Sequence, residues 1–292
     1  MYKIALVIID PQNSFCKQVD PKDQQIIHDG ELCVPGAWED MLRVANLIKT
    51  VGNKLYDIHI TMDCHHLFHI AHPAWWKDSK GNPPGPFTIM SEQNGEFIGS
   101  QLINGSMQEV GKYSCSVPST TKWTVHYLQT LKTNGKYPHC IWPPHCLIGT
   151  PGNNVVEPLM EAILEWESNQ KAVVTKVTKG SNLRVEHFSA IKAEVEDPED
   201  YTTSINDKFI KTLMKADELW FAGEAGSHCL ANTVRDIADS SPNDEFIKKC
   251  TLLLDGTSPV PGFENLQDQF IKDMEGRGMK TASIDECIKK LS

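Results

Sequence analysis

Residues 3–15 read KIALVIIDPQNSF, and this stretch decides the expected fold. Residues 3–9 contain a continuous apolar run rather than an alternating one, which is typical of a parallel strand covered on both faces. The run ends at Asp10, and open α/β sheets bind their ligands at the carboxyl ends of such strands. On this stretch alone, an Asx-type turn ahead of Pro11 would explain the aspartate equally well. The sequence therefore predicts a central parallel strand and makes Asp10 a candidate site residue.

Strand and helix patterns alternate through the rest of the chain. Further strands are predicted at residues 55–61, 139–142, 172–178, 218–222, 246–254 and 280–283. Helices are predicted at residues 35–51, 121–133, 158–166, 205–215 and 266–278, with one more after Cys229. This alternation predicts the α/β class, with a three-layer αβα arrangement around a mostly parallel central sheet of about six strands.

The segment from about residue 78 to residue 120 interrupts this alternation. Residues 81–86 form a loop by composition, and residues 95–118 are polar, with glycine, serine and asparagine throughout. We expect a single domain over residues 1–292, with this segment as an insertion that leaves the core to form a lid or an oligomer contact. A homo-oligomer and a monomer both remain open.

Composition limits the classes of partner. The 292 residues are 40% hydrophobic and 23% charged, as in globular proteins. A formal net charge of −10 opposes phosphate backbones, and no basic stripe offsets it. No apolar run approaches the roughly 18 residues of a membrane span, and the N-terminal run lacks the features of a signal peptide. We therefore expect a small-molecule substrate and no nucleic-acid or membrane partner.

The cysteines predict the compartment. Nine of them are scattered at positions 16, 33, 64, 115, 140, 146, 229, 250 and 287, without a CxxC pair. A secreted disulfide framework normally has an even number of patterned cysteines in a short chain. Reduced thiols and a cytoplasmic location fit the pattern better.

Cys229 has the position of a reactive thiol. Residues 221–231 read FAGEAGSHCLA and continue the short apolar strand predicted at residues 218–222. Leu230, Val234 and Ile237 then recur at helical spacing, so Cys229 lies at the start of a helix. There the free backbone N–H groups and the helix dipole favour the thiolate that a nucleophile needs. A buried structural cysteine is the alternative that this stretch leaves open.

A dense histidine cluster follows the strand predicted at residues 55–61. Residues 63–72 read DCHHLFHIAH, with one aspartate and four histidines. Imidazole and carboxylate groups are natural ligands of zinc and similar divalent ions, and the spacing of Asp63 and His65 can aim both at one point. His145, after the strand predicted at residues 139–142, is a candidate for the missing ligand. A solvated loop is the alternative interpretation of the cluster.

Six reactive side chains are expected to meet. Each follows a predicted strand, and they are Asp10, Asp63, His65, His145, Lys179 and Cys229. The carboxyl ends of parallel strands lie along one edge of a sheet, so these groups should line one crevice. Separate structural roles for all six at one edge would be a coincidence, and the convergence therefore favours a functional site.

The order of these motifs resembles the isochorismatase-like cysteine hydrolases, and among them the nicotinamidase (pyrazinamidase) branch. The segments that carry the resemblance are residues 9–15 (IDPQNSF), 61–65 (TMDCH), 142–152 (WPPHCLIGTPG), 179–180 with 188–190, and 223–229 (GEAGSHC). They cover nearly the whole chain in order. The resemblance implies the three-layer fold, hydrolysis of nicotinamide to nicotinate and ammonia, and a cis peptide bond between Glu224 and Ala225.

The resemblance also implies catalytic roles. Cys229 would be the nucleophile that forms a thioester, with Asp10 as acid and base. Lys179 would hold both groups, and it is preferred to Lys176 because a matching glycine follows it. The backbone N–H groups of Ala225 and Cys229 would form the oxyanion hole.

A divalent metal ion is the cofactor that the resemblance implies, and it would bind the pyridine nitrogen of the substrate. Asp63, His65 and His145 would hold it, while His69 would either be a ligand or only line the site. Zinc is the expected ion, with iron and manganese as alternatives.

For the substrate ring, Phe15 and Trp75, or the adjacent Trp76, are the predicted contacts, although paired tryptophans beside a loop are often plain packing. The chain also departs from the family. Gly226, Ser227 and His228 stand where these enzymes often have Thr, Asp and Tyr, which leaves the substrate open.

Other functions fit the same residues. A related cysteine hydrolase would act on another amide, ureide or carbamoyl C–N bond. In a zinc hydrolase of a different class, metal-bound water would attack and Cys229 would be passive. A metal-stabilised binding protein without turnover would not need the acid, lysine and cysteine together.

Overall fold

A six-stranded sheet forms the centre of the computed structural model, which describes residues 2–19, 25–134 and 137–292. In spatial order, its strands are β10 (Thr175–Lys179), β4 (Asp57–Asp63), β1 (Ile4–Ile9), β11 (Glu218–Gly223), β12 (Cys250–Leu253) and β13 (Lys280–Ala282). Every neighbouring pair is parallel. The predicted parallel sheet of about six strands is confirmed.

β1 takes a central position because its sequence requires burial on both faces. All six of its residues are buried, and it pairs with β4 on one side and with β11 on the other. Gly223 permits a close approach at the end of this pairing, since a Cβ there would lie 2.0 Å from the carbonyl oxygen of Ile9. Its φ of +111° also favours glycine. The ends of β1 and β11 therefore lie side by side.

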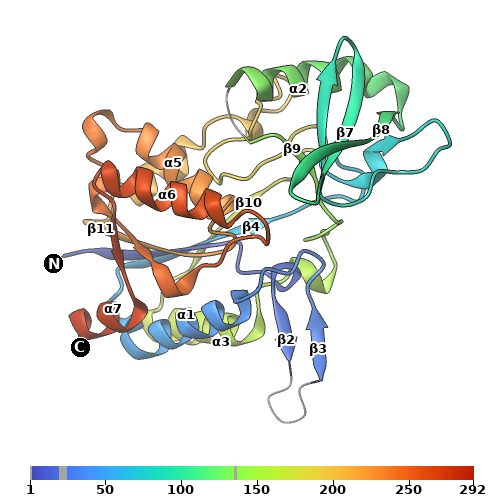
Figure 1. Ribbon diagram of the computed structural model, residues 1–292. Helices are drawn as coiled ribbons and strands as arrows, with labels where there is room; N and C mark the ends of the chain where they lie inside the picture. Colours follow the sequence, from blue (N-terminus) through green and yellow to red (C-terminus); the bar gives the residue numbers. More distant parts are fainter. Residues whose placement is uncertain (1, 20–24, 135–136) are drawn as a thin grey trace.

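Helices cover both faces of the sheet (Figure 1). On one face lie α1 (Ala37–Val51), α3 (Glu157–Gln170) and α7 (Ile284–Leu291), and on the other lie α5 (Cys229–Asp239) and α6 (Glu264–Gly276). The short α4 (Asp207–Leu213) precedes β11. α7 was not predicted, although Ser283 and Glu286 form a capping box at its start. The three-layer αβα arrangement is confirmed.

A second, antiparallel sheet contains much of the segment predicted as an insertion. In spatial order, its strands are β5 (Trp76–Lys77), β8 (Ser106–Cys115), β7 (Glu96–Ile103), β6 (Thr88–Gln93) and β9 (His139–Ile141), and α2 (Thr121–Asn134) follows β8 in the chain. The assignment of residues 139–142 to the parallel sheet was therefore wrong, because β9 pairs with β6. Most of β8 is exposed, which explains the polar composition that hid these strands.

A separate apolar cluster lies between this sheet and α2. Its largest members are Trp75, Trp76, Phe97 and Tyr127, and Ile141 of β9 belongs to it. The apolar residues at 139–142 are thus explained by burial on two sides, since Ile141 lies in this second cluster and Cys140 and Trp142 lie in the main core. β9 still leads the chain towards His145, although from a different sheet than expected.

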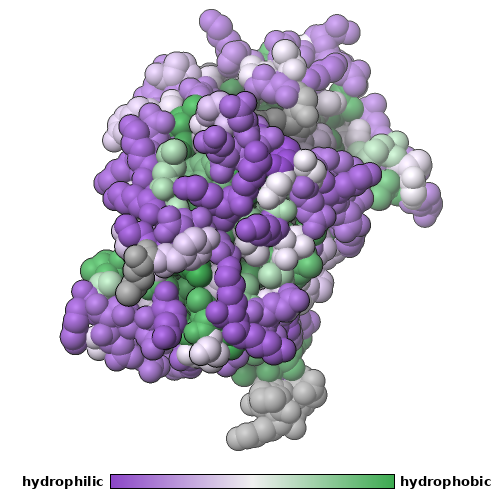
Figure 2. All heavy atoms as spheres, turned by 90° about the vertical axis from the view of Figure 1, so that its left-hand side faces the viewer, coloured by the Kyte–Doolittle hydropathy of each residue, from purple (hydrophilic) through white to green (hydrophobic). Residues whose placement is uncertain are grey.

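The surface agrees with the composition. Figure 2 shows a face on which hydrophilic residues predominate and apolar residues form small, separate groups. No helix of the described residues combines the length and apolarity that a membrane crossing requires. The hairpin of β2 (Lys17–Val19) and β3 (Ile26–Asp29), which was not predicted, projects beside α3 in Figure 1.

Acid sensitivity can be tested at His139 on β9. Burial lowers the pKa of His139 to about 4, and the ring bonds the carbonyl of Ile70 at 3.0 Å. An unfolded histidine has a pKa of about 6.5, so the unfolded chain binds a proton that the folded chain does not, and stability is lost as the pH falls from there towards 4. We expect His139→Gln to reduce the slope of the unfolding free energy against pH by about 1 kcal/mol per pH unit near pH 5.5, measured by urea denaturation.

His126→Gln is the matched control, because His126 is exposed on α2. It should leave the slope unchanged. Equal slopes for the wild type and His139→Gln would show that His139 is not held neutral by burial.

Candidate active site

Four reactive side chains meet at the carboxyl edge of the central sheet. Asp10 follows β1, Asp63 ends β4, Lys179 ends β10 and Cys229 begins α5. Lys179 Nζ lies 2.8 Å from Asp10 Oδ2, 3.1 Å from Asp63 Oδ1 and 3.5 Å from Cys229 Sγ. All four side chains are buried. Their carboxylate, ammonium and sulfur groups share one enclosed space, as the strand topology predicted.

Charge at this group is set by burial and by Lys179. Burial alone would lower the pKa of Lys179, but Asp10 and Asp63 together hold it well above its usual value, so the ammonium is retained. Burial raises the pKa of Asp10, while Lys179 and a hydrogen bond of 2.6 Å from Thr61 Oγ1 oppose that shift. Burial and Lys179 therefore act in opposite directions on the charge of Asp10.

The predicted thiolate at Cys229 is not supported for the protein without substrate. Burial raises the pKa of the Cys229 thiol well above its usual value, although Lys179 favours the thiolate. The position at the start of α5 was correctly predicted, but burial outweighs the helix dipole there. The thiol therefore needs a base, and Asp10 lies close enough, since one oxygen of Asp10 is within 4.8 Å of the sulfur.

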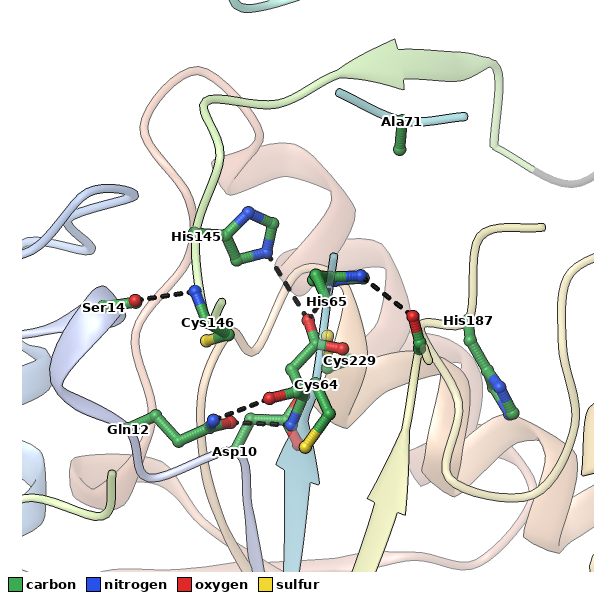
Figure 3. A network of polar contacts seen from close by, with 12 residues as sticks. Asp10, Gln12, Ser14, Cys64, His65, Ala71, His145, Cys146, His187 and Cys229 are labelled. Carbon is green, nitrogen blue, oxygen red and sulfur yellow. Dashed lines mark hydrogen bonds and ion pairs between the residues drawn. The ribbon is translucent and has the colours of Figure 1, made fainter. Parts of the chain in front are cut away.

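Asp63, His65 and His145 form an adjoining group that fits a divalent cation. Asp63 Oδ2 lies 3.0 Å from His65 Nε2 and 3.5 Å from His145 Nε2 (Figure 3). The other nitrogens, His65 Nδ1 and His145 Nδ1, lie 3.2 Å and 2.9 Å from the carbonyl oxygens of Gly180 and Pro143. Because a carbonyl only accepts, each Nδ1 carries a proton, which leaves each Nε2 facing Asp63. Without a cation, Asp63 opposes burial and raises the pKa of His65, so a bound cation would take the place of the Nε2 proton. A carboxylate and two imidazole lone pairs at one point suit zinc.

His69 and His72 lie beside this group and differ in their hydrogen bonds. His69 Nδ1 accepts from the Ala71 N–H, and His69 Nε2 bonds the Val185 carbonyl, both at 3.1 Å. Both ring nitrogens of His69 thus have backbone partners, although one ligand atom each of His65, His69 and His72 lie within 4.8 Å of one another, which makes these three a second group that could hold an ion. His72, which sequence reasoning did not select, has a buried Nε2 with no hydrogen-bond partner among the described residues, and its ring lies 5.2 Å from that of His65.

Side chains after β1 fix the two ligand segments. Gln12 bonds the backbone of Asp63 twice, donating to its carbonyl and accepting from its N–H, each at 2.7 Å (Figure 3). Ser14 Oγ accepts a hydrogen bond of 2.8 Å from the N–H of Cys146, the residue after His145. The stretch that decides the fold therefore also positions Asp63 and His145.

A small pocket leads to Cys229. Its aromatic lining comprises Phe15, Trp142, Phe188 and His228, and the remaining lining residues are Leu32, Asp63, His145, Glu186, Ala225, Cys229 and Val260. Phe15 was predicted, and its ring centroid lies 5.5 Å from that of His145. The contact predicted for Trp75 was wrong: Trp75 is fully buried in the second apolar cluster, where it stacks on Phe68 at 4.9 Å. Trp76 belongs to the same cluster.

Glu186 is a second site residue that sequence reasoning missed. It is buried, its Oε1 accepts from the His187 N–H at 2.9 Å, and its Oε2 has no hydrogen-bond partner among the described residues. Burial raises its pKa. Its only signal in the sequence was its position two residues before Phe188, where a segment that carries part of the resemblance begins.

The three departures in the nucleophile segment have structural explanations. A Cβ at Gly226 would lie 2.0 Å from Gln267 Oε1 on α6, so the glycine makes room for that helix. Ser227 Oγ accepts from the Val260 N–H at 3.0 Å and shares a second hydrogen bond of 2.8 Å with His228 Nδ1. Burial lowers the pKa of His228 to about 3, so the ring is neutral. The neutral ring adds a polar group to the pocket wall.

The backbone of this segment also matches expectation. The peptide bond between Glu224 and Ala225 is cis, as the resemblance implied. The carbonyl of Ala225 accepts from the N–H groups of His228 and Leu230 at 3.0 and 3.2 Å, which binds the turn to the start of α5. Ala225 and Cys229 are thereby brought to the same wall of the pocket.

Comparisons with known proteins identify the fold. No protein-family model matches the sequence, and no curated protein matches it. Among solved structures, the yeast nicotinamidase Pnc1p bound to the inhibitor nicotinaldehyde is 18% identical, with a TM-score of 0.60 over 96% of this chain and 99% of that chain.

Two further structures have the same arrangement. The pyrazinamidase of Pyrococcus horikoshii in complex with zinc is 17% identical, with a TM-score of 0.52 over 96% of this chain and 99% of that one. An isochorismatase family protein from Desulfovibrio vulgaris is 16% identical, with a TM-score of 0.50 over 100% and 99% of the two chains. These likenesses show that the chain has the isochorismatase-like fold found in nicotinamidases.

Metal content tests the assignment of the ligand group. We expect His145→Ala to reduce bound zinc to a few per cent of the wild-type level after both proteins are loaded with zinc and desalted, because it removes one of three converging donors. Inductively coupled plasma mass spectrometry would measure it. His28→Ala, at a histidine whose ring bonds the Asn13 carbonyl outside this group, is the control and should keep its zinc. A zinc content unchanged by His145→Ala would rule out His145 as a required ligand.

Proposed function

We propose that the protein is a cysteine-dependent amidase that hydrolyses nicotinamide to nicotinate and ammonia. The observation that carries this proposal is the contact of one buried ammonium, Lys179, with both the Asp10 carboxylate and the Cys229 sulfur. The fold shared with nicotinamidases supports the choice of a carboxamide substrate. The adjoining group of Asp63, His65 and His145 supports substrate binding that is assisted by a metal ion.

In the proposed first half-reaction, Asp10 takes the proton of the Cys229 thiol and the sulfur attacks the carboxamide carbon. Lys179 remains protonated and stabilises the negative charge on both partners. The oxygen of the tetrahedral adduct would be bound by the N–H groups of Ala225 and Cys229, and one such donor typically contributes about 3 kcal/mol. Asp10 then gives its proton to the departing nitrogen, the C–N bond breaks and ammonia leaves a thioester.

In the second half-reaction, Asp10 removes a proton from water as the water adds to the thioester carbon. The C–S bond breaks, Cys229 recovers a proton from Asp10, and the product leaves as nicotinic acid, which ionises to nicotinate in water. Acid and base roles thus alternate on one carboxyl group, which fits a pKa raised by burial and lowered by Lys179.

Asp63, His65 and His145 would hold a divalent cation, for which zinc is the proposed identity. When bound, the ion supplies a coordination position for the pyridine nitrogen of the substrate. Phe15 would contact the ring, and the neutral imidazole of His228 would face the substrate from the pocket wall.

A related cysteine hydrolase is the second candidate. The imidazole of His228 and the partly unsatisfied Glu186 give this pocket polar groups that nicotinamide alone need not use. They suit an amide, ureide or carbamoyl compound with further polar atoms. Ammonia release from nicotinamide, N-carbamoyl and ureido compounds, compared at equal concentration, separates the two.

Cys229→Ala tests the nucleophile. Without the sulfur no thioester can form, so ammonia release from nicotinamide should fall by about a thousandfold or more. A coupled ammonia assay measures the rate, and circular dichroism checks the fold. Cys33→Ala is the matched control, because Cys33 is a partly exposed thiol outside the site.

A variant that kept more than a few per cent of the wild-type rate would refute the role of Cys229. If, in addition, a chelator abolished that residual rate, metal-dependent hydrolysis with a passive cysteine would replace the thioester mechanism.

A further inference from the structure

Two buried carboxyl groups lie behind the nucleophile segment and take no part in the proposed reaction. Glu224, which directly precedes Ala225, has 0% of its surface exposed, and Asp40 on α1 has 2%. Both approach Ser258, a residue of the loop after β12. Paired carboxyl groups are costly to bury unless a proton or a cation balances their charge.

Hydrogen bonds indicate where the proton lies. Asp40 accepts from Arg43 at 2.5 Å through Oδ1 and from Ser258 Oγ at 2.6 Å through Oδ2. Glu224 Oε2 accepts from the Ser258 N–H at 3.2 Å, while Glu224 Oε1 is buried and meets no donor among the described residues. Glu224 and Asp40 therefore converge on the two donors of one residue, Ser258. Two carboxyl groups buried together favour a proton on one of them, and the ion pair with Arg43 favours the charge on Asp40.

Ser258 connects this pair to the nucleophile segment. Its N–H donates to the Glu224 side chain, and its carbonyl accepts from the Gly226 N–H at 2.8 Å. Thr257 Oγ1 also donates to the Gly223 carbonyl at 2.6 Å. Ala225 therefore lies between two residues that are both tied to Ser258.

We propose that Glu224 is a positioning residue, which shares one proton with Asp40 and, through Ser258, fixes the segment that presents the N–H groups of Ala225 and Cys229. Loss of that proton would leave two negative charges against each other in a dry space and would push the Glu224 carboxylate, and with it the segment, away from Asp40. The catalytic consequence rests on the proposed function, whereas the shared proton does not.

The surroundings of Glu224 agree with this assignment. The charges of Asp40 and Arg43 on α1 shift the pKa of Glu224. The charge of Glu224 in turn shifts the pKa of Cys16, which lies ahead of β2. Burial raises the pKa of Glu224 well above its usual value and the charge of Asp40 adds to the shift, with only Arg43 and the Ser258 N–H opposing it.

The shared proton can be tested without a substrate. A folded-state pKa above the unfolded value of about 4.3 means that folding binds a proton, so stability is greatest at low pH and falls as the pH rises through the folded pKa. Glu224→Gln keeps the hydrogen bonds and removes the titration. Between pH 5.5 and 7.5, we expect the unfolding equilibrium constant of the wild type to rise up to tenfold per pH unit more steeply than that of the variant.

Glu218→Gln is the control, since Glu218 begins β11, the strand that Glu224 follows, but is paired with Lys290 at 2.6 Å and has a lowered pKa. It should not flatten the alkaline rise. Identical slopes for the wild type and Glu224→Gln in urea denaturation would overturn the shared proton.

Activity tests the positioning role. Glu224→Ala should lower kcat for ammonia release by about tenfold or more with KM within twofold, and Glu224→Gln should restore kcat and lose the alkaline decline of the wild type. If Glu224→Ala does not fold, Glu224→Leu replaces it. Equal kcat in the alanine or leucine variant and the wild type would overturn the role. If the wild type hydrolysed no amide, the proposed function would fail. The stability test would still decide whether Glu224 and Asp40 share a proton.

Discussion

A buried ammonium group has to be balanced by nearby negative charge, and the site depends on how this chain balances Lys179. Lys179 comes from β10, and its two carboxylate partners come from β1 and β4, the next strands of the sheet. Removing one partner of such a buried pair typically costs about 3–5 kcal/mol, because the remaining charge is left uncompensated. The same ion pairs therefore hold three strand ends together and keep a positive charge beside Cys229.

Two kinds of restraint act on the nucleophile segment. On the side of the pocket, the ionised Lys179 stabilises negative charge on Asp10 and on the sulfur. On the opposite side, Glu224 and Asp40 keep a proton between them and hold the segment through Ser258. Gly223 and Gly226 are needed for packing, the first against β1 and the second against Gln267. The nucleophile segment is thus held on its pocket side by the charged Lys179 and on the opposite side by the pair of Glu224 and Asp40, which keeps one proton.

The sequence predicted the parts that depend on strand ends. A continuous apolar strand and a residue directly after it define a position along one edge, so Asp10, Asp63, Lys179 and Cys229 could be placed together before any coordinates were known. The pattern could not assign residues 139–142 to the correct sheet, because a short apolar run shows burial but not its partner. The second sheet was missed because most residues of β8 are exposed, so that strand has no apolar pattern in the sequence. Trp75 failed as a substrate contact because an aromatic pair in a sequence signals burial but not the core that buries it, and both tryptophans lie in the second apolar cluster. The charge state of Cys229 depends on burial, which its motif does not report. His72 and Glu186 were missed because a single buried side chain leaves no periodic signal.

The central claim is that the Cys229 sulfur attacks a carbonyl carbon while Lys179 and Asp10 stay in contact with it. The most direct measurement is a crystal structure of the protein soaked with pyridine-3-carbaldehyde, whose carbonyl accepts a thiol to form a thiohemiacetal. The account predicts continuous density from Cys229 Sγ to the former aldehyde carbon, with the new oxygen at the N–H groups of Ala225 and Cys229. Density for an unreacted aldehyde, together with a Cys229 sulfur turned away from both Lys179 and Asp10, would contradict it.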